Sequence, residues 1–162
     1  MRVPTVAAVA GYCLGGGLAI AAACDIRVAS PDASFGVPIA RTIGNCLSIS
    51  TIAALIEQFG AARMKDMLLR SRMQSAEDAL TAGFVSELVP WADLLECAET
   101  IANELAENAP LTMWATKEAV RRIRLAGLPT DDDIVRTVYG SKDFQKGVRD
   151  FLEKRPHDWT GR

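Results

Sequence analysis

Short apolar runs separated by glycine and proline fill the first part of the chain. Thr5–Ala10, Ile26–Ser30 and Phe84–Val89 are short and apolar, and each run is bounded by glycine or proline, which predicts three buried strands. Gly16–Cys24 is apolar throughout and opens with glycine, which predicts a buried helix. Strands interleaved with helices indicate an α/β fold for this part of the chain.

Apolar residues at helical spacing dominate the rest. A last helix is expected after Thr130, which precedes three aspartates and has the character of an N-cap. The chain therefore divides into a strand and helix core over residues 1–90 and a helical region over residues 91–162. The other expected helices are Ser48–Phe59, Ala62–Leu69, Ala76–Ala82, Leu94–Ala106 and Thr112–Leu125.

Composition narrows the class of protein. The chain has 162 residues, of which 49% are hydrophobic and 23% charged, enough for one globular domain with a real core. A formal charge of −2 gives no general attraction to nucleic acid or to an anionic membrane. The four cysteines form no CxxC pair, which argues against a zinc site and a disulfide framework. Reduced thiols suit the cytoplasm, where we expect the protein to be.

A second interpretation of the amino terminus is an export signal. No charged residue occurs from Val3 to Cys24, and Arg2 precedes this run, as in a lipoprotein leader that ends at Cys24. Pro4 and the glycines interrupt the segment repeatedly, whereas the apolar part of a leader is a compact helix. A buried strand–turn–helix unit is the favoured interpretation.

The three glycines at positions 15–17 suggest chemistry at the backbone. They do not form a phosphate loop, because no Gly-Lys-Ser/Thr follows and Ile20 stands where G-x-G-x-x-G requires its last glycine. A glycine corner at the start of a helix leaves backbone N–H groups unpaired, at the positive end of the helix dipole. Such a corner can hold an oxygen that gains negative charge. A purely structural glycine turn is the alternative.

Longer motifs then carry a family resemblance. "PTVAAVAGYCLGGGLAIAAACDIRVASPDASFGVP" at residues 4–38, "SAEDALTAGFVSELV" at residues 75–89 and the carboxy-terminal "DFQKGVRDFLEKRPHDWTGR" resemble, in this order, the crotonase (enoyl-CoA hydratase/isomerase) superfamily. The resemblance covers essentially the whole chain. It implies the second half of a spiral of strand–strand–helix turns, followed by a helical tail that mediates oligomerisation.

The resemblance also implies a function in fatty acid metabolism. Members bind an acyl-CoA thioester, with coenzyme A as part of the substrate and no other cofactor, and stabilise an enolate with two backbone N–H groups. By position Gly16 supplies one of them, with Gly15 beside it. Lys154 matches a lysine that approaches coenzyme A phosphates bound by a neighbouring subunit; the alternative is a solvated helix-end lysine. A homotrimer or a hexamer is expected.

Two positions depart from the family pattern. Hydratases carry one glutamate two residues after the triple glycine and another directly after the "FGxP" proline, where this chain has Ala19 and Ile39. Neither can transfer a proton, so ordinary hydration is not expected and an isomerase that relies on the second glutamate is also disfavoured. Lyase or isomerase chemistry with another proton-transfer group remains, and the alternative is a catalytically inactive binding or assembly module.

Polar groups after Pro38 are the nearest candidates for substrate contacts. Arg41 is suited to a substrate carboxylate, and Asn45 or Ser48 to a carbonyl or a water molecule. Helix caps and loop hydrogen bonds are the competing interpretation. Cys46 is expected to be a small buried hydrophobe, and Asp25 to hydrogen-bond a turn. No metal-ligand pattern is present.

The amino terminus is the last departure. In the family, about a third of the chain precedes the first strand found here and supplies the second oxyanion N–H, which implies a fragment or a truncated product. Loss of one such donor costs about 3–4 kcal/mol of transition-state stabilisation. Uncovered strand edges and apolar surface then favour self-association.

Overall fold

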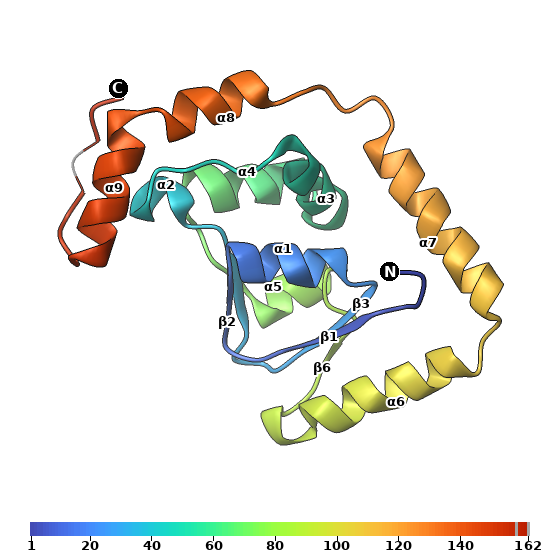
Figure 1. Ribbon diagram of the computed structural model, residues 1–162. Coiled ribbons are helices and arrows are strands. Elements are labelled where there is room, and N and C mark those ends of the chain that lie inside the picture. Colours follow the sequence, from blue (N-terminus) through green and yellow to red (C-terminus); the bar gives the residue numbers. More distant parts are fainter. Residues whose placement is uncertain (158, 162) are drawn as a thin grey trace.

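The structure is a computed structural model that describes residues 1–157 and 159–161 (Figure 1). The strands are β1 (Val6–Val9), β2 (Tyr12–Leu14), β3 (Ile26–Ala29), β4 (Ser34–Gly36), β5 (Gln74–Ser75) and β6 (Glu87–Leu88). The helices are α1 (Gly16–Ala23), α2 (Ile39–Thr42), α3 (Ile49–Phe59), α4 (Ala61–Leu69), α5 (Ala76–Thr81), the 3₁₀ turn η1 (Trp91–Asp93), α6 (Leu94–Ala106), α7 (Pro110–Leu125), α8 (Asp132–Tyr139) and α9 (Lys142–Leu152).

Two small sheets form the core of the spiral. One has the parallel order β1-β3-β6, with Val6 opposite Ile26. The other has the order β2-β4-β5, in which β2 and β4 are parallel and β5 runs antiparallel to β4. Successive turns of the chain add one strand to each sheet, and helices cover them (Figure 1). The α/β class predicted from the sequence is confirmed.

The elements around the glycines differ from the prediction in one respect. The strands expected at Thr5–Ala10 and Ile26–Ser30 are confirmed as β1 and β3, and the helix as α1. β2 was not predicted, because Gly11 was taken only as the end of β1. Gly11 has a φ of +62°, which turns the chain so that a second strand begins one residue later. The triple glycine therefore follows β2.

The strand predicted at Phe84–Val89 is much shorter in the structure. Only Glu87 and Leu88 pair with β3, while Phe84 is buried as a core side chain. The ring of Phe84 stacks on Phe59 of α3 with 4.3 Å between centroids, and it meets Phe35 of β4 edge-on at 5.4 Å. Phe84 is apolar because it packs in this aromatic cluster, and it does not belong to a strand. The cluster joins the β4 layer to α3.

A buried arginine holds the carboxy-terminal end of α1. The Arg27 guanidinium donates hydrogen bonds to the carbonyl oxygens of Ala21 (3.1 Å) and Cys24, and to that of Phe84. Its positive charge offsets the partial negative charge at this helix end. Burial lowers the pKa of Arg27, and the carbonyl contacts take the place of a carboxylate partner. The sequence pattern did not indicate that Arg27 would be buried against these carbonyl groups.

The carboxy-terminal helices run around the core as an arc (Figure 1). α6 lies along β1 and β3, α7 lies beside α3, and α9 reaches α2. The expectation that Thr130 caps the next helix was wrong, since Asp131 occupies the N-cap position of α8. The Asp131 carboxylate instead accepts a hydrogen bond of 2.8 Å from the backbone N–H of Ile49, the first residue of α3. A residue of the tail thus caps a helix of the core.

No helix in the described part of the chain is both long and apolar enough to cross a membrane.

Replacement of Asp131 by alanine tests this long-range cap. Loss of a capping carboxylate costs about 1 kcal/mol, so we expect Asp131→Ala to lower the free energy of unfolding in urea by about that amount. Asp133→Ala is the matched control, because Asp133 is exposed on the first turn of the same helix. Equal losses in the two variants would contradict the assignment of the cap to Asp131.

Candidate functional site

Gly15 fixes the geometry of the glycine corner. It has a φ of +51°, which favours glycine, and it stands at the N-cap of α1. Its N–H donates a 2.9 Å hydrogen bond to the carbonyl of Gly36 at the end of β4, and its own carbonyl accepts from Ala19 N–H at 3.1 Å. Gly15 was proposed as a substrate contact from the sequence. The structure shows that its N–H is already engaged within the fold.

Gly16 presents the free amide of the corner. It is exposed, and none of the turn, loop and cap hydrogen bonds in the described residues is donated by its N–H. A methyl group added at Gly16 would meet no other atom within 4 Å, and the same holds at Gly17. The residue is therefore exposed, with open space where a side chain would stand. It lies at the start of α1, where the helix dipole supplies partial positive charge.

The surroundings of the corner are apolar and contain no carboxylate on the first turn of α1. Ala19 is half-buried on α1. Ile39 opens α2, where it is partly buried and packs against the hydrophobic core. An oxygen at Gly16 would therefore meet a backbone donor, with no proton-transfer group at Ala19 or Ile39.

The candidates after Pro38 lie on α2 and the loop that follows it. Arg41 is exposed on α2. The Oδ1 atom of Asn45 is buried without a hydrogen-bond partner among the described residues. Ser48 is the N-cap of α3, and its hydroxyl accepts from Thr51 N–H at 3.2 Å. Ser48 thus has the capping role that the sequence analysis held open, and Asn45 keeps an unused acceptor.

Lys154 lies at the other end of the tail helix α9. It is exposed and has a φ of +53°, where the chain leaves the helix. The structure therefore leaves its ammonium group in solvent within this chain.

Two thiols near the corner are unsuited to nucleophilic attack. Burial raises the pKa of Cys46, and the negative charge of Asp131 raises it further. Burial also raises the pKa of Cys13, which lies on β2. Because the thiolate is the nucleophile, both side chains are inert thiols near neutral pH.

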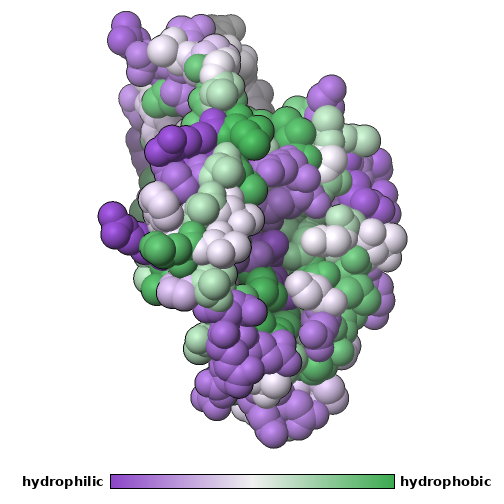
Figure 2. All heavy atoms as spheres, turned by 90° about the vertical axis from the view of Figure 1, so that its right-hand side faces the viewer, coloured by the Kyte–Doolittle hydropathy of each residue, from purple (hydrophilic) through white to green (hydrophobic). Residues whose placement is uncertain are grey.

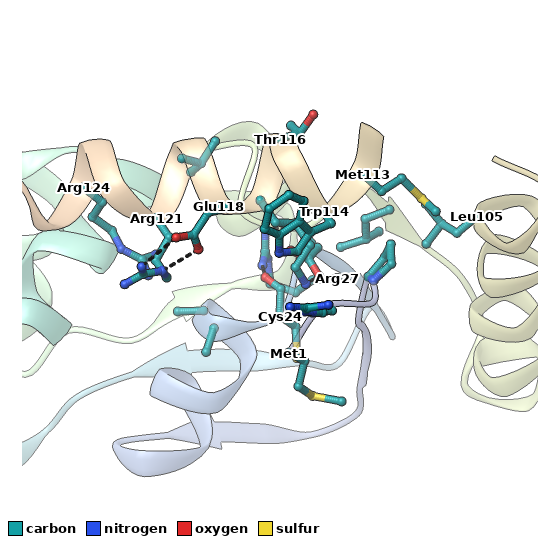
Figure 3. Close-up of a pocket in the computed structure, with 18 of the residues that line it drawn as sticks. Met1, Cys24, Arg27, Leu105, Met113, Trp114, Thr116, Glu118, Arg121 and Arg124 are labelled. Carbon is teal, nitrogen blue, oxygen red and sulfur yellow. Dashed lines mark hydrogen bonds and ion pairs between the residues drawn. The ribbon is translucent and has the colours of Figure 1, made fainter. Parts of the chain in front are cut away.

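A cavity of about 820 Å³ lies at the opposite end of α1 (Figure 3). Trp114 and Glu118 project into it from α7, and Cys24 and Arg27 line the opposite wall. α1 has eight residues, so its two ends are about 12 Å apart and this cavity does not include Gly16. The face that carries α7 mixes hydrophobic and hydrophilic residues (Figure 2).

Most charges around this cavity are paired within the fold. The Asp25 carboxylate accepts hydrogen bonds from the Thr5 N–H (2.7 Å) and hydroxyl (2.8 Å), and it pairs with Lys117 of α7. Asp25 thus holds the turn before β3, as predicted. The Arg121 and Arg122 guanidinium groups lower the pKa of Glu118 to about 2. The contacts of Asp25 with Thr5 and Lys117 thus attach α7 to the core.

The Asp25 contacts predict a pH dependence of stability. Burial raises the pKa of Asp25, but hydrogen bonds from Lys117 and Thr5 outweigh it and leave the pKa below its ordinary value of about 3.9. A lowered carboxyl pKa contributes stability in full above the ordinary value, and this contribution is lost as the pH falls through the folded pKa. Asp25→Asn should cost about 1 kcal/mol at pH 7.

The measurement is urea unfolding of both proteins from pH 7 to pH 2. The difference between wild type and Asp25→Asn should narrow below about pH 4. A difference that stays constant across this range would show that the charge of Asp25 does not stabilise the fold.

Comparison with known proteins agrees with this fold. The sequence model of the enoyl-CoA hydratase/isomerase family matches residues 1–162. The 2,3-dehydroadipyl-CoA hydratase of Escherichia coli K12 is 34% identical over 163 residues, covering 98% of this chain and 64% of the hydratase. The (E)-benzylidenesuccinyl-CoA hydratase of Thauera aromatica is also 34% identical, covering 98% of this chain and 63% of that protein.

Solved structures give the same result. Methylmalonyl-CoA decarboxylase in complex with 2-nitronate-propionyl-CoA superimposes with a TM-score of 0.91 at 25% identity, over 99% of this chain and 64% of that one. Carnitinyl-CoA hydratase from Mycobacterium avium superimposes with a TM-score of 0.83 at 28% identity, over all of this chain and 64% of the other. The chain belongs to the enoyl-CoA hydratase/isomerase family, the crotonase superfamily, and spans 63–64% of these relatives' length.

Proposed function

We propose that this chain binds an acyl-CoA thioester and holds its carbonyl oxygen at the Gly16 N–H while that oxygen gains negative charge. The observation that carries this proposal is the unengaged, exposed amide of Gly16 at the start of α1. Membership of a family whose relatives are named for CoA thioesters supports the substrate class. A backbone amide that is held rigidly stabilises an oxyanion without reorganisation during the reaction.

We infer that hydration is not the reaction. Addition of water to an enoyl thioester requires an acid and a base, and Ala19 and Ile39 supply neither. Loss of CO₂ from a 2-carboxyacyl thioester forms an enolate without a base. In that step the C–C bond to the carboxylate breaks, its electron pair enters the enolate, CO₂ leaves, and the carbon takes a proton from solvent. The likeness to methylmalonyl-CoA decarboxylase supports this reaction class.

The apolar surroundings suit such a step. Ile39 packs against the core and Ala19 is half-buried, so a carboxylate beside them loses hydration that neutral CO₂ does not need. Arg41 lies exposed on α2 and has the charge to attract an anionic substrate. A thioester-binding or assembly module without catalysis is the second candidate, because the same two residues remove the usual proton-transfer pair.

The proposal extends to assembly and location. α1 exposes the Ile20 side chain at 70%, and β1 and β2 each have one unpaired edge within the described sheets. A homotrimer or hexamer would cover such surface, and Lys154 would then be available to the coenzyme A phosphates of a neighbouring subunit. We expect this assembly in the cytoplasm.

Removal of one N–H tests the oxyanion contact. Proline is tolerated at the first position of a helix, where its missing N–H would be unpaired, so Gly16→Pro deletes the amide at little structural cost. The affinity for a CoA thioester that carries a nitronate in place of the enolate should fall about 100-fold. Gly16→Ala adds a side chain into the same open space but keeps the N–H, and should bind within about fivefold of wild type.

Calorimetry measures both affinities, and circular dichroism checks the fold. If Gly16→Pro binds the nitronate as tightly as Gly16→Ala, the oxyanion does not sit at this amide.

Turnover separates the reaction classes. We expect hydration of crotonyl-CoA to be negligible and methylmalonyl-CoA to release CO₂. The double variant Ala19→Glu, Ile39→Glu should slow CO₂ release at least about tenfold, since a second carboxylate repels the substrate carboxylate. Loss of the crotonyl-CoA absorbance and release of labelled CO₂ are the readouts. Thioester binding without either turnover would favour the binding module, and rapid hydration by the wild type would overturn the proposal.

A further inference from the structure

The loop that joins α2 to α3 contacts an aromatic side chain, Trp159, from the carboxy-terminal end of the chain. In this loop Gly44 has a φ of +66°, and a methyl group added there would lie 2.9 Å from the Trp159 ring. On α9, Gly147 is buried, and a methyl group there would lie 2.9 Å from the same ring and 2.7 Å from the Ile43 carbonyl oxygen. The Trp159 ring therefore fills a notch between Gly44 and Gly147. The notch exists only because neither residue has a side chain.

Contacts on both sides hold Trp159 in this notch. Before it, the His157 ring stacks on the indole with 4.9 Å between centroids and an angle of 20°. After it, the Thr160 hydroxyl donates to the Asp143 carboxylate at 2.7 Å, and the Gly161 N–H donates to the same carboxylate at 2.6 Å. These bonds fasten the chain terminus to α9. The indole thus packs between α9 and the loop, with 39% of the residue still exposed.

The clamped loop is connected through α2 to the strand that bonds the glycine corner. β4 ends at Gly36, whose carbonyl accepts the Gly15 N–H, and α2 begins three residues later. Figure 1 shows α2 above the start of α1, with α9 next to α2. The loop of residues 43–48 continues from α2 and carries Asn45, whose Oδ1 is a buried acceptor with no partner in the described chain. Through Trp159 the tail therefore contacts the segment that follows β4 and α2.

We propose that Trp159 is a positioning residue for the thioester site. Its ring holds residues 43–48 against α9, so that the Asn45 Oδ1 atom stays in place to accept a hydrogen bond from an amide N–H of the coenzyme A part of the ligand. The effect on ligand rests on the proposed function. The effect on the loop does not, because it follows from the glycine notch alone.

The experiment measures two quantities on the full chain. Trp159→Ala should increase the hydrogen-exchange rate of the amides in residues 43–48 at least about tenfold, with exchange in β1 and β3 unchanged. It should also weaken binding of acetyl-CoA about five- to tenfold by calorimetry. Trp159→Phe keeps an aromatic ring and should recover most of both quantities. Trp91→Ala is the matched control, because Trp91 is 73% exposed on η1 and should change neither.

Each outcome bears on the proposal. Exchange in residues 43–48 within twofold of wild type in Trp159→Ala would overturn the clamp. Faster exchange with unchanged acetyl-CoA affinity would overturn the positioning role. A wild-type chain that binds no thioester, but whose loop exchange rises in the variant, would count against the proposed function and leave the clamp supported.

Discussion

The hydrogen bond from the Gly15 N–H to the Gly36 carbonyl is the constraint on which the site depends. It joins the start of α1 to the end of β4, and the left-handed conformation of Gly15 directs the chain into the helix. The first N–H groups of α1 have no acceptor one turn earlier, so the Gly16 amide beside this bond has no partner among the described residues. An ordinary residue at position 15 would be strained, and the corner would lose its shape.

The other end of α1 is fixed by a different device. Arg27 brings a buried positive charge to the carbonyl groups at the helix end, and Asp25 ties the next turn to Thr5 and to Lys117. With both ends fastened, an eight-residue helix has little freedom to tilt. This rigidity bears on the proposed oxyanion contact, since a preorganised donor stabilises charge that develops in a transition state more than it stabilises the ground state.

The sequence predicted the α/β class, the strands β1 and β3 and the glycine turn before α1, because these depend on local apolar runs and on glycine. None of the three strands of the second sheet was predicted. β2 escaped prediction since its three residues follow a turn set by the φ of Gly11. Arg27 and Trp159 escaped it for another reason. Their contacts join residues far apart in the chain, and a single arginine or tryptophan gives no sign of a carbonyl cluster or a glycine notch elsewhere. Likewise, Asp131 was assigned to its own helix, whereas it caps α3.

The amide resonance of Gly16 tests the central claim most directly. In a ¹⁵N–¹H spectrum of the labelled full chain, addition of a nitronate-bearing acyl-CoA analogue should move the Gly16 proton strongly downfield, as expected for a new hydrogen bond to a charged oxygen. The Gly15 amide, already bonded to Gly36, should move far less. A Gly16 amide that does not shift when the analogue is bound, or that is already protected from exchange without it, would contradict the account.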